Sequence, residues 1–123
     1  MNLCIALAAK TIVVAATSFT LSWEHSIEKI VWQEDWAVTS EGLVPTQARI
    51  SGSATGVDPG PGARLDDGMW VWKPNLLPQR TLRLAASGAT PGPWKLCAGE
   101  TCFDFGTRSG VPVILSPCYD ENL

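Results

Sequence analysis

Glycine and proline interrupt this chain so often that only short regular segments fit between them. Eleven glycines and nine prolines are spread over 123 residues, with clusters at 59–62, 73–78, 87–93 and 106–110. Both residue types favour turns, and proline also removes a backbone hydrogen-bond donor, so long helices are disfavoured. The spacing predicts short strands joined by turns, as in an antiparallel β-sandwich or a small barrel.

Alternation of apolar and polar side chains indicates where the strands lie. Leu21, Trp23 and His25 alternate with polar residues, and a second alternation places Glu34 on one face with tryptophans. A period of two residues is typical of half-buried strands. We expect about eight short strands in one all-β domain. That domain spans residues 19–116, is followed by a carboxyl tail at 117–123, and has further strand candidates at 43–50, 69–72, 81–85, 94–105 and 111–115.

The first 18 residues differ from the rest of the chain. Lys10 is the only charged residue between Leu3 and Leu21, and Ala16 and Ser18 are small enough for a cleavage site. The pattern predicts a signal peptide or a membrane-anchor-like segment, and a buried first strand remains the alternative. Lys10 argues against a transmembrane helix, which needs about 20 apolar residues without a central charge. We therefore expect an exported protein, periplasmic or membrane-associated.

The cysteines point to the same kind of compartment. Cys97 and Cys102 enclose a two-residue turn at Gly99-Glu100, and this turn places the two cysteines opposite each other in a hairpin. Non-hydrogen-bonded cross-strand pairs come close enough to be bridged, so we predict a Cys97–Cys102 disulfide. Disulfides persist in oxidising compartments.

A metal knuckle is the alternative for these cysteines. Structural zinc uses four ligands, and only Cys118 and His25 remain as good candidates if Cys4 is removed with a signal peptide. We therefore expect no metal and no cofactor. Cys118 is then expected to be an unpaired thiol near the carboxyl tail.

His25 and Glu34 interrupt the apolar faces of their strands. If the connecting loop centres near residues 29 and 30, His25 lies opposite or diagonal to Glu34, where cross-strand side chains touch. A buried carboxylate needs a partner such as imidazolium. The pair is either a structural ion pair that fixes the hairpin or part of a site for a ligand, proton or metal.

Several function classes are disfavoured by the same residues. Nine basic residues against twelve acidic ones give a net charge of -3, without a basic run, which disfavours nucleic-acid binding. The chain has no Walker loop and no dinucleotide fingerprint. A triad of Ser26, His25 and Glu34 is rejected because adjacent strand residues point to opposite faces. Six tryptophans favour core packing, with sugar binding as the alternative.

One family resemblance rests on a block of particular residues. Residues 21–38 read LSWEHSIEKIVWQEDWAV and are followed by Gly42-Leu43, by 52–65 and by Asp67-Gly68-Met69-Trp70. These segments resemble the bacterial family called domain of unknown function eighteen-fifty over roughly two thirds of the chain. The family's motif positions correspond to His25, Ser26, Glu28 and Glu34. Where the family has a Gly-Ala-Gly-Met loop, this chain differs and has the sequence ATGV at 54–57.

The resemblance implies a role in solute uptake. Members are typically small exported proteins encoded beside TRAP transporters of the TAXI type, which pair a permease with a periplasmic solute receptor. We therefore expect a non-enzymatic accessory or regulator at the membrane surface, whose turn at 27–30 and loop at 52–62 contact the permease or the receptor. The alternative is a periplasmic small-ligand or metal-binding domain that uses His25, Glu34 and Glu28.

Overall fold

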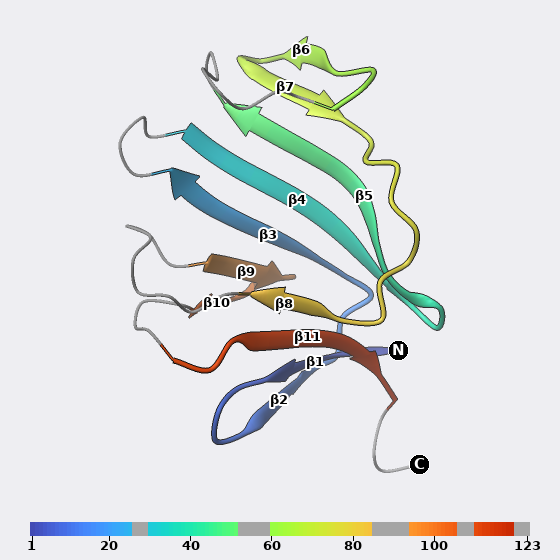
Figure 1. The fold of residues 1–123 in the computed structure, drawn as a ribbon, viewed down its shortest axis with the longest axis vertical. Helices are drawn as coiled ribbons and strands as arrows, with labels where there is room; N and C mark the ends of the chain where they lie inside the picture. The colour runs from blue at the N-terminus through green and yellow to red at the C-terminus, as the bar shows by residue number, and fades with distance from the viewer. Residues whose placement is uncertain (26–29, 52–59, 85–93, 106–109, 120–123) are drawn as a thin grey trace.

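The chain folds into two antiparallel β-sheets of unequal size. The computed structural model describes residues 1–25, 30–51, 60–84, 94–105 and 110–119 (Figure 1). The smaller sheet has the strand order β2 (Thr11–Val14), β1 (Asn2–Ala6), β11 (Val113–Cys118) and β8 (Leu82–Leu84). The larger sheet has the order β10 (Thr101–Phe105), β9 (Trp94–Ala98), β3 (Ser18–His25), β4 (Ile30–Thr39), β5 (Gly42–Ser51), β7 (Met69–Trp72) and β6 (Arg64–Asp66). The all-β, sandwich-like prediction is confirmed, and the sheets are not closed into a barrel.

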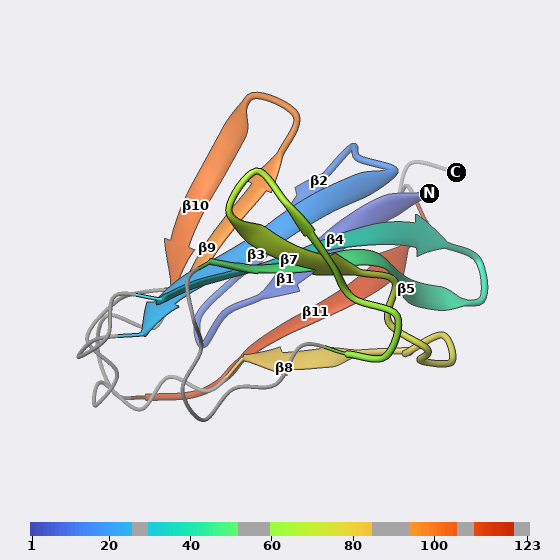
Figure 2. The ribbon, with the colours of Figure 1, turned by 90° about the horizontal axis from the view of Figure 1, so that it is seen from above.

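The main core lies where the smaller sheet covers part of the larger one. Leu3, Ile5 and Leu115 of the smaller sheet are fully buried, and so is Leu96 of the larger sheet. Figures 1 and 2 show the smaller sheet across one end of the larger sheet, while β4, β5 and β7 extend beyond it. The main cluster is completed by buried residues of both sheets: Phe19, Leu21, Trp36, Val38, Leu43, Leu84, Ala98, Phe105 and Val113.

The amino-terminal residues form strands of the smaller sheet. Leu3 and Ile5 of β1 point into the core, and Lys10 lies exposed in the turn before β2, where its carbonyl accepts a 2.8 Å hydrogen bond from the Leu7 amide. In this structure the segment is therefore the buried first strand that the sequence left as an alternative. Its removal on export stays a prediction. The part of the chain that the structure describes contains no helix long and apolar enough to cross a bilayer.

The carboxyl end differs from the expected tail. β11 continues through Pro117 and Cys118, and Cys118 forms a disulfide with Cys4 of β1, with their Cα atoms 5.8 Å apart. The prediction of an unpaired Cys118 thiol is therefore wrong. It failed because it assumed that Cys4 was lost with the first 18 residues.

The cysteine hairpin has the predicted register. β9 pairs with β10 through Cys97 opposite Cys102 and Lys95 opposite Asp104, and the two cysteines are joined by a disulfide. The predicted Cys97–Cys102 bridge is therefore confirmed. Both disulfides are typical of an oxidising, extracytoplasmic environment.

Candidate functional site

The sequence-predicted site residues do not all come together. His25 is the last residue of β3 and its backbone lies opposite Ile30, whereas Glu34 lies opposite Leu21. Four positions along β3, about 13 Å at the usual rise per residue, separate the two backbone positions. The expected placement of His25 opposite or diagonal to Glu34 is therefore wrong. Ser26 and Glu28 lie outside the described residues.

The length of the connecting loop explains the difference. The pairing of His25 with Ile30 leaves only residues 26–29 between the strands, so the hairpin centre lies two residues earlier than expected. In an antiparallel pair, such a shift moves every cross-strand partner by four positions. The face to which Glu34 belongs is nevertheless the predicted one, because Trp32 and Trp36 share it.

Glu34 lies at the boundary between two hydrophobic clusters. Its neighbours across the sheet are Leu21 of β3, in the main core, and Ala48 of β5, in a second cluster with Ile50 and Trp72. The Glu34 side chain is half-buried and accepts a 3.2 Å hydrogen bond at Oε1 from the indole Nε1 of Trp36. A carboxylate is thus held at a fixed place on an otherwise apolar surface.

A row of indole rings crosses the larger sheet next to Glu34. The ring centroid of Trp23 lies 4.5 Å from that of Trp94 and 5.3 Å from that of Trp32, and the Trp32 and Trp72 centroids are 5.5 Å apart. Cross-strand pairing explains the row, because Trp23 lies opposite Trp32. Gly60 packs directly against Trp72, since a Cβ at Gly60 would clash with Cδ1 and Nε1 of the indole. We call Glu34, Trp23, Trp32 and Trp72 the tryptophan face.

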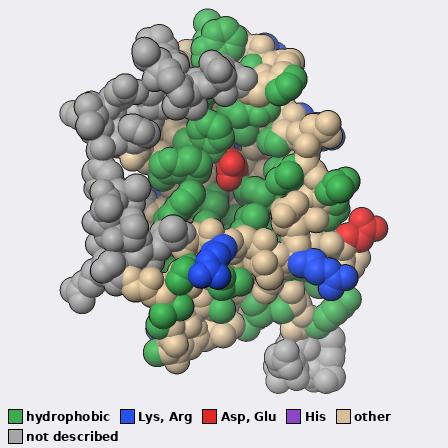
Figure 3. All heavy atoms as spheres, in the orientation of Figure 1, with side chains coloured by type: hydrophobic (Ala, Val, Ile, Leu, Met, Phe, Trp, Pro, Cys, Tyr) green, Lys and Arg blue, Asp and Glu red, His purple; other side chains and the backbone are tan. Residues whose placement is uncertain are grey.

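The tryptophan face belongs to the part of the larger sheet that the smaller sheet leaves uncovered. Figure 3 shows hydrophobic side chains gathered around an acidic side chain in the upper half of the molecule, over the strands β3 to β5 of Figure 1. Trp23, Trp32 and Glu34 are only half-buried. The indole nitrogen of Trp32 is buried and has no hydrogen-bond partner among the described residues.

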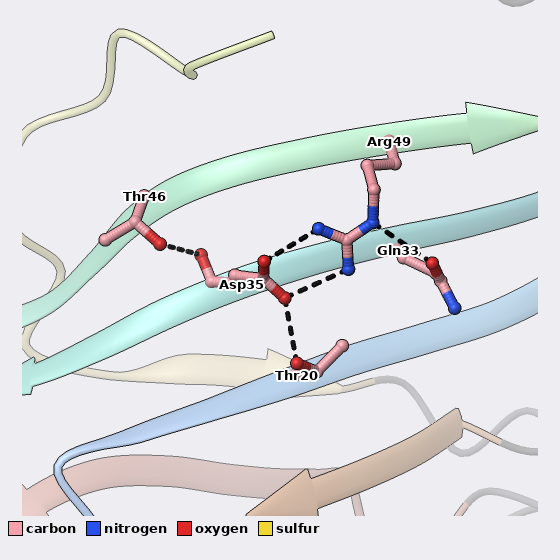
Figure 4. Close-up of polar contacts among 5 residues, drawn as sticks. All are labelled: Thr20, Gln33, Asp35, Thr46 and Arg49. Atoms are coloured by element: carbon pink, nitrogen blue, oxygen red, sulfur yellow. Dashed lines mark hydrogen bonds and ion pairs between the residues drawn. The ribbon is translucent and has the colours of Figure 1, made fainter. Parts of the chain in front are cut away.

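The opposite face of the same strands carries a polar network that the sequence analysis did not identify (Figure 4). Arg49 donates from Nη1 and Nη2 to the two carboxylate oxygens of Asp35, at 2.7 and 3.1 Å, and from Nε to Gln33 at 3.2 Å. Thr20 donates to Asp35 at 2.8 Å. The hydrogen bond from Arg49 lowers the pKa of Asp35, with a further contribution from Thr20, and the same bond raises the pKa of Arg49. The alternation of polar residues on β3, β4 and β5 was the signal for this network.

This polar network satisfies its own charges. Among the residues that the structure describes, Arg49 and Asp35 form the one ion pair, and their hydrogen bonds use both carboxylate oxygens. A hollow of about 450 Å³ lies beside it, lined by Thr20, Asp35 and Cys97 among others. We interpret the network as a structural link between β3, β4 and β5 rather than as a reactive site.

Two other expectations concern metals and loops. Within the described ranges, no three His, Cys, Asp or Glu side chains lie together as metal ligands. The loop at 52–62 that was expected to contact a partner is described only from Gly60 onward. Gly60 supports Trp72, so this end of the loop contributes to the tryptophan face.

Comparison with known proteins gives one result. Residues 19–105 match the family described as Domain of unknown function (DUF1850). No curated protein and no solved structure matches the chain. The matched segment runs from the start of the predicted domain at Phe19 to the end of β10, and it includes every residue of the tryptophan face. Because the match covers well over half of the sequence, the chain belongs to the DUF1850 family.

Proposed function

We propose that this protein is a non-enzymatic, exported accessory or regulator of a TRAP transporter of the TAXI type, acting at the periplasmic side of the membrane. The observation that carries the proposal is the uncovered half of the larger sheet, where partly exposed tryptophans surround one carboxylate. Apolar surface of this kind on a small domain is typical of a binding face. The TAXI partnership comes from the family resemblance.

The chemistry of the face supports a binding role. The Trp36 indole donates a hydrogen bond that fixes the Glu34 carboxylate beside aromatic side chains, and aromatic residues are enriched at recognition surfaces. The two disulfides support an exported location. A rigid sheet that presents aromatic side chains suits recognition of a permease or a solute receptor.

Co-purification tests the proposal. The full chain, expressed with the permease and the solute receptor of a TAXI-type system, is expected to recover at least one of them from solubilised membranes. Leu65 of β6 is 62% exposed and lies opposite Trp70, at the rim of the uncovered part of the sheet. We expect Leu65→Asp to lower the recovered partner, because a charge enters an apolar interface.

Val13→Asp is the matched control for this experiment. Val13 is 51% exposed on β2 of the smaller sheet, so the variant adds the same charge on another surface. Equal recovery with both variants would place the contact elsewhere, and recovery of neither component by the unaltered chain would refute the transporter role.

Export is tested separately by intact mass with and without reduction. Protein from the periplasmic or membrane fraction should contain oxidised cysteines. A mass that includes residues 1–18 and two bridges would match the disulfides described above, whereas a mass starting near Phe19 would indicate cleavage. Four free thiols in cytosolic protein would contradict export.

A second candidate function is binding of a small ligand, for which Glu34 and His25 were the predicted residues. The specific observation in its favour is the Glu34 carboxylate beside the row of indole rings. Glu34 and the tryptophans carry this candidate, because the register separates His25 from Glu34.

A further inference from the structure

We propose that the tryptophan face binds a quaternary ammonium group, held against the indole rings and neutralised by the Glu34 carboxylate. This inference rests on the second candidate function and names the chemical class of its ligand. Three properties of the face favour this ligand: its negative charge, its aromatic rings and its small supply of hydrogen-bond acceptors.

Glu34 gives the tryptophan face a negative charge. Glu34 faces Leu21 on one side and Ala48 on the other, and its recorded hydrogen-bond donor is the neutral indole of Trp36. Within the described part of the chain, the one ion pair belongs to Arg49 and Asp35 on the opposite face. A partly buried carboxylate without a cation is costly. A bound cation would offset that cost.

The rings supply the second attraction for a cation. The negative face of an indole attracts a cation within about 6 Å of the ring centroid, and tryptophan is the strongest of the aromatic residues in this respect. The Trp23 and Trp32 centroids lie 5.3 Å apart, and the Trp72 ring stands edge-on to Trp32 at 78°. Glu34 is two residues from Trp32 on the same face of β4, so the carboxylate and the rings belong to one surface of the sheet.

The charge of Glu34 favours a cation over a sugar. A neutral sugar would leave the half-buried carboxylate without a counter-charge, whereas a cation is attracted both by the carboxylate and by an indole face. Neighbouring rings in this row are inclined by 27°, 56° and 78°, so their faces point in more than one direction. The rounded, diffuse charge of a methylated ammonium ion needs no single ring orientation.

The shortage of acceptors distinguishes a quaternary from a primary ammonium ion. A primary ammonium has three N–H donors, and each needs an acceptor when it leaves water. The residues flanking Glu34 across the sheet, Leu21 and Ala48, have no polar side-chain atoms. A quaternary ammonium has no N–H group, so it leaves no donor unsatisfied on this apolar surface.

Titration with tetramethylammonium chloride tests the proposal on the full oxidised chain. Total chloride is held constant by replacing sodium chloride, and the indole N–H signals of a ¹⁵N-labelled sample are followed by nuclear magnetic resonance. We expect saturable shifts of the Trp32 and Trp36 indole signals. Methylammonium should need at least a severalfold higher concentration. Shifts that do not saturate, or that sodium chloride reproduces, would overturn the proposal.

Charge removal identifies the anionic partner. Glu34→Gln keeps the acceptor for Trp36 but removes the charge, and we expect it to weaken tetramethylammonium binding about tenfold or more. Glu24→Gln is the control, because Glu24 is exposed and lies on the opposite face of β3, one residue from Trp23. Equal binding by both variants would refute the role of Glu34. Saturable shifts with maltose but not with tetramethylammonium would instead assign the face to sugars.

These outcomes are independent of the transporter experiment. An unaltered chain that gives no saturable indole shifts can still recover the permease or the receptor, and a failed co-purification leaves the indole shifts intact. If Glu34→Gln fails to fold, the indole signals of the unaltered chain still decide whether the site exists.

Discussion

At the scale of single residues, the described contacts of Glu34 do not include the structural ion-pair partner that was expected for it. Leu21, rather than His25, lies opposite Glu34, and the hydrogen bond from Trp36 needs an acceptor but no negative charge. Its position between two hydrophobic clusters makes an unpaired carboxylate a cost to folding. Function is a common reason for keeping such a cost.

Glu34→Gln should therefore leave the fold at least as stable as before. We expect the free energy of unfolding in urea at pH 7 to stay the same or to rise by up to about 1 kcal/mol, because Oε1 remains as the acceptor for Trp36 and the unpaired charge is removed. A structural ion pair predicts otherwise, because its loss costs about 3–5 kcal/mol. A loss of that size would restore the structural interpretation of Glu34 and require a cation beside it.

Asp35 makes stability depend on pH in acid. The Arg49 guanidinium lowers the pKa of Asp35, so the folded state favours the carboxylate more strongly than the unfolded chain does. This contribution is present above the ordinary aspartate pKa of about 3.9 and is lost as the pH falls through the lower folded value. Because the Asp35 side chain is 33% exposed, solvent screening limits the contribution to about 1 kcal/mol.

Asp35→Asn tests this dependence. We expect the variant to lose about 1 kcal/mol of unfolding free energy at pH 7 and to converge with the unaltered chain near pH 2. Urea denaturation at both pH values measures the difference. If the difference in unfolding free energy between the variant and the unaltered chain stays constant between pH 7 and pH 2, the Asp35 charge contributes nothing to stability and only the shape of the side chain matters.

At the scale of strands and loops, the alternation of apolar and polar residues predicted where the strands lie better than it predicted how they pair. The alternating patterns located β3, β4 and β5. The turn at Gly99-Glu100 determined the β9–β10 register, because a two-residue turn allows few alternative pairings. The longer connection between β3 and β4 leaves several registers open, so the partner of Glu34 was wrong. β1 was ambiguous because a short apolar run suits a signal segment as well as a strand. β6 has three exposed residues and carries no pattern.

The β4–β5 hairpin pairs, next to Gly42, with the segment that precedes β8. Leu43 and Gln79 exchange backbone hydrogen bonds of 2.7 and 2.9 Å beside Gly42. Gly42 has a φ of 138°, and a Cβ there would lie 2.6 Å from the backbone oxygen of Gln79. Only glycine therefore permits this close approach.

Gly42→Ala should separate the hairpin from that segment. We expect a loss of about 1–3 kcal/mol in unfolding free energy, from backbone strain and the displaced Gln79 bridge. Gly110→Ala is the control, because its Cβ would meet nothing within 4 Å and its backbone has no positive φ. Equal stability of the two variants in urea would show that the Gln79 segment adjusts without cost.

At the scale of the whole molecule, the smaller sheet is assembled from both ends of the chain. β1 comes from residues near the amino terminus and β11 from residues near the carboxyl terminus, and they pair along five positions. Leu3, Ile5 and Leu115 from these two strands enter the main core, fully buried. The Cys4–Cys118 disulfide joins the same strands, so it links the two ends across a separation of 114 residues.

The two disulfides should therefore differ in what they contribute to stability. In the chain-entropy account, a bridge restricts the unfolded chain more when it closes a longer loop. By that account Cys4–Cys118 contributes about 5 kcal/mol, whereas Cys97–Cys102, with a separation of 5 residues, contributes about 2 kcal/mol. Paired substitution of each bridge by serine and urea denaturation under non-reducing conditions measures both values. If loss of Cys97–Cys102 costs as much as loss of Cys4–Cys118, loop length does not determine what these bridges contribute. If loss of Cys4–Cys118 costs more, restriction of the unfolded chain by the longer loop is the larger contribution, and the bridge between β1 and β11 is the one on which the stability of the domain depends more.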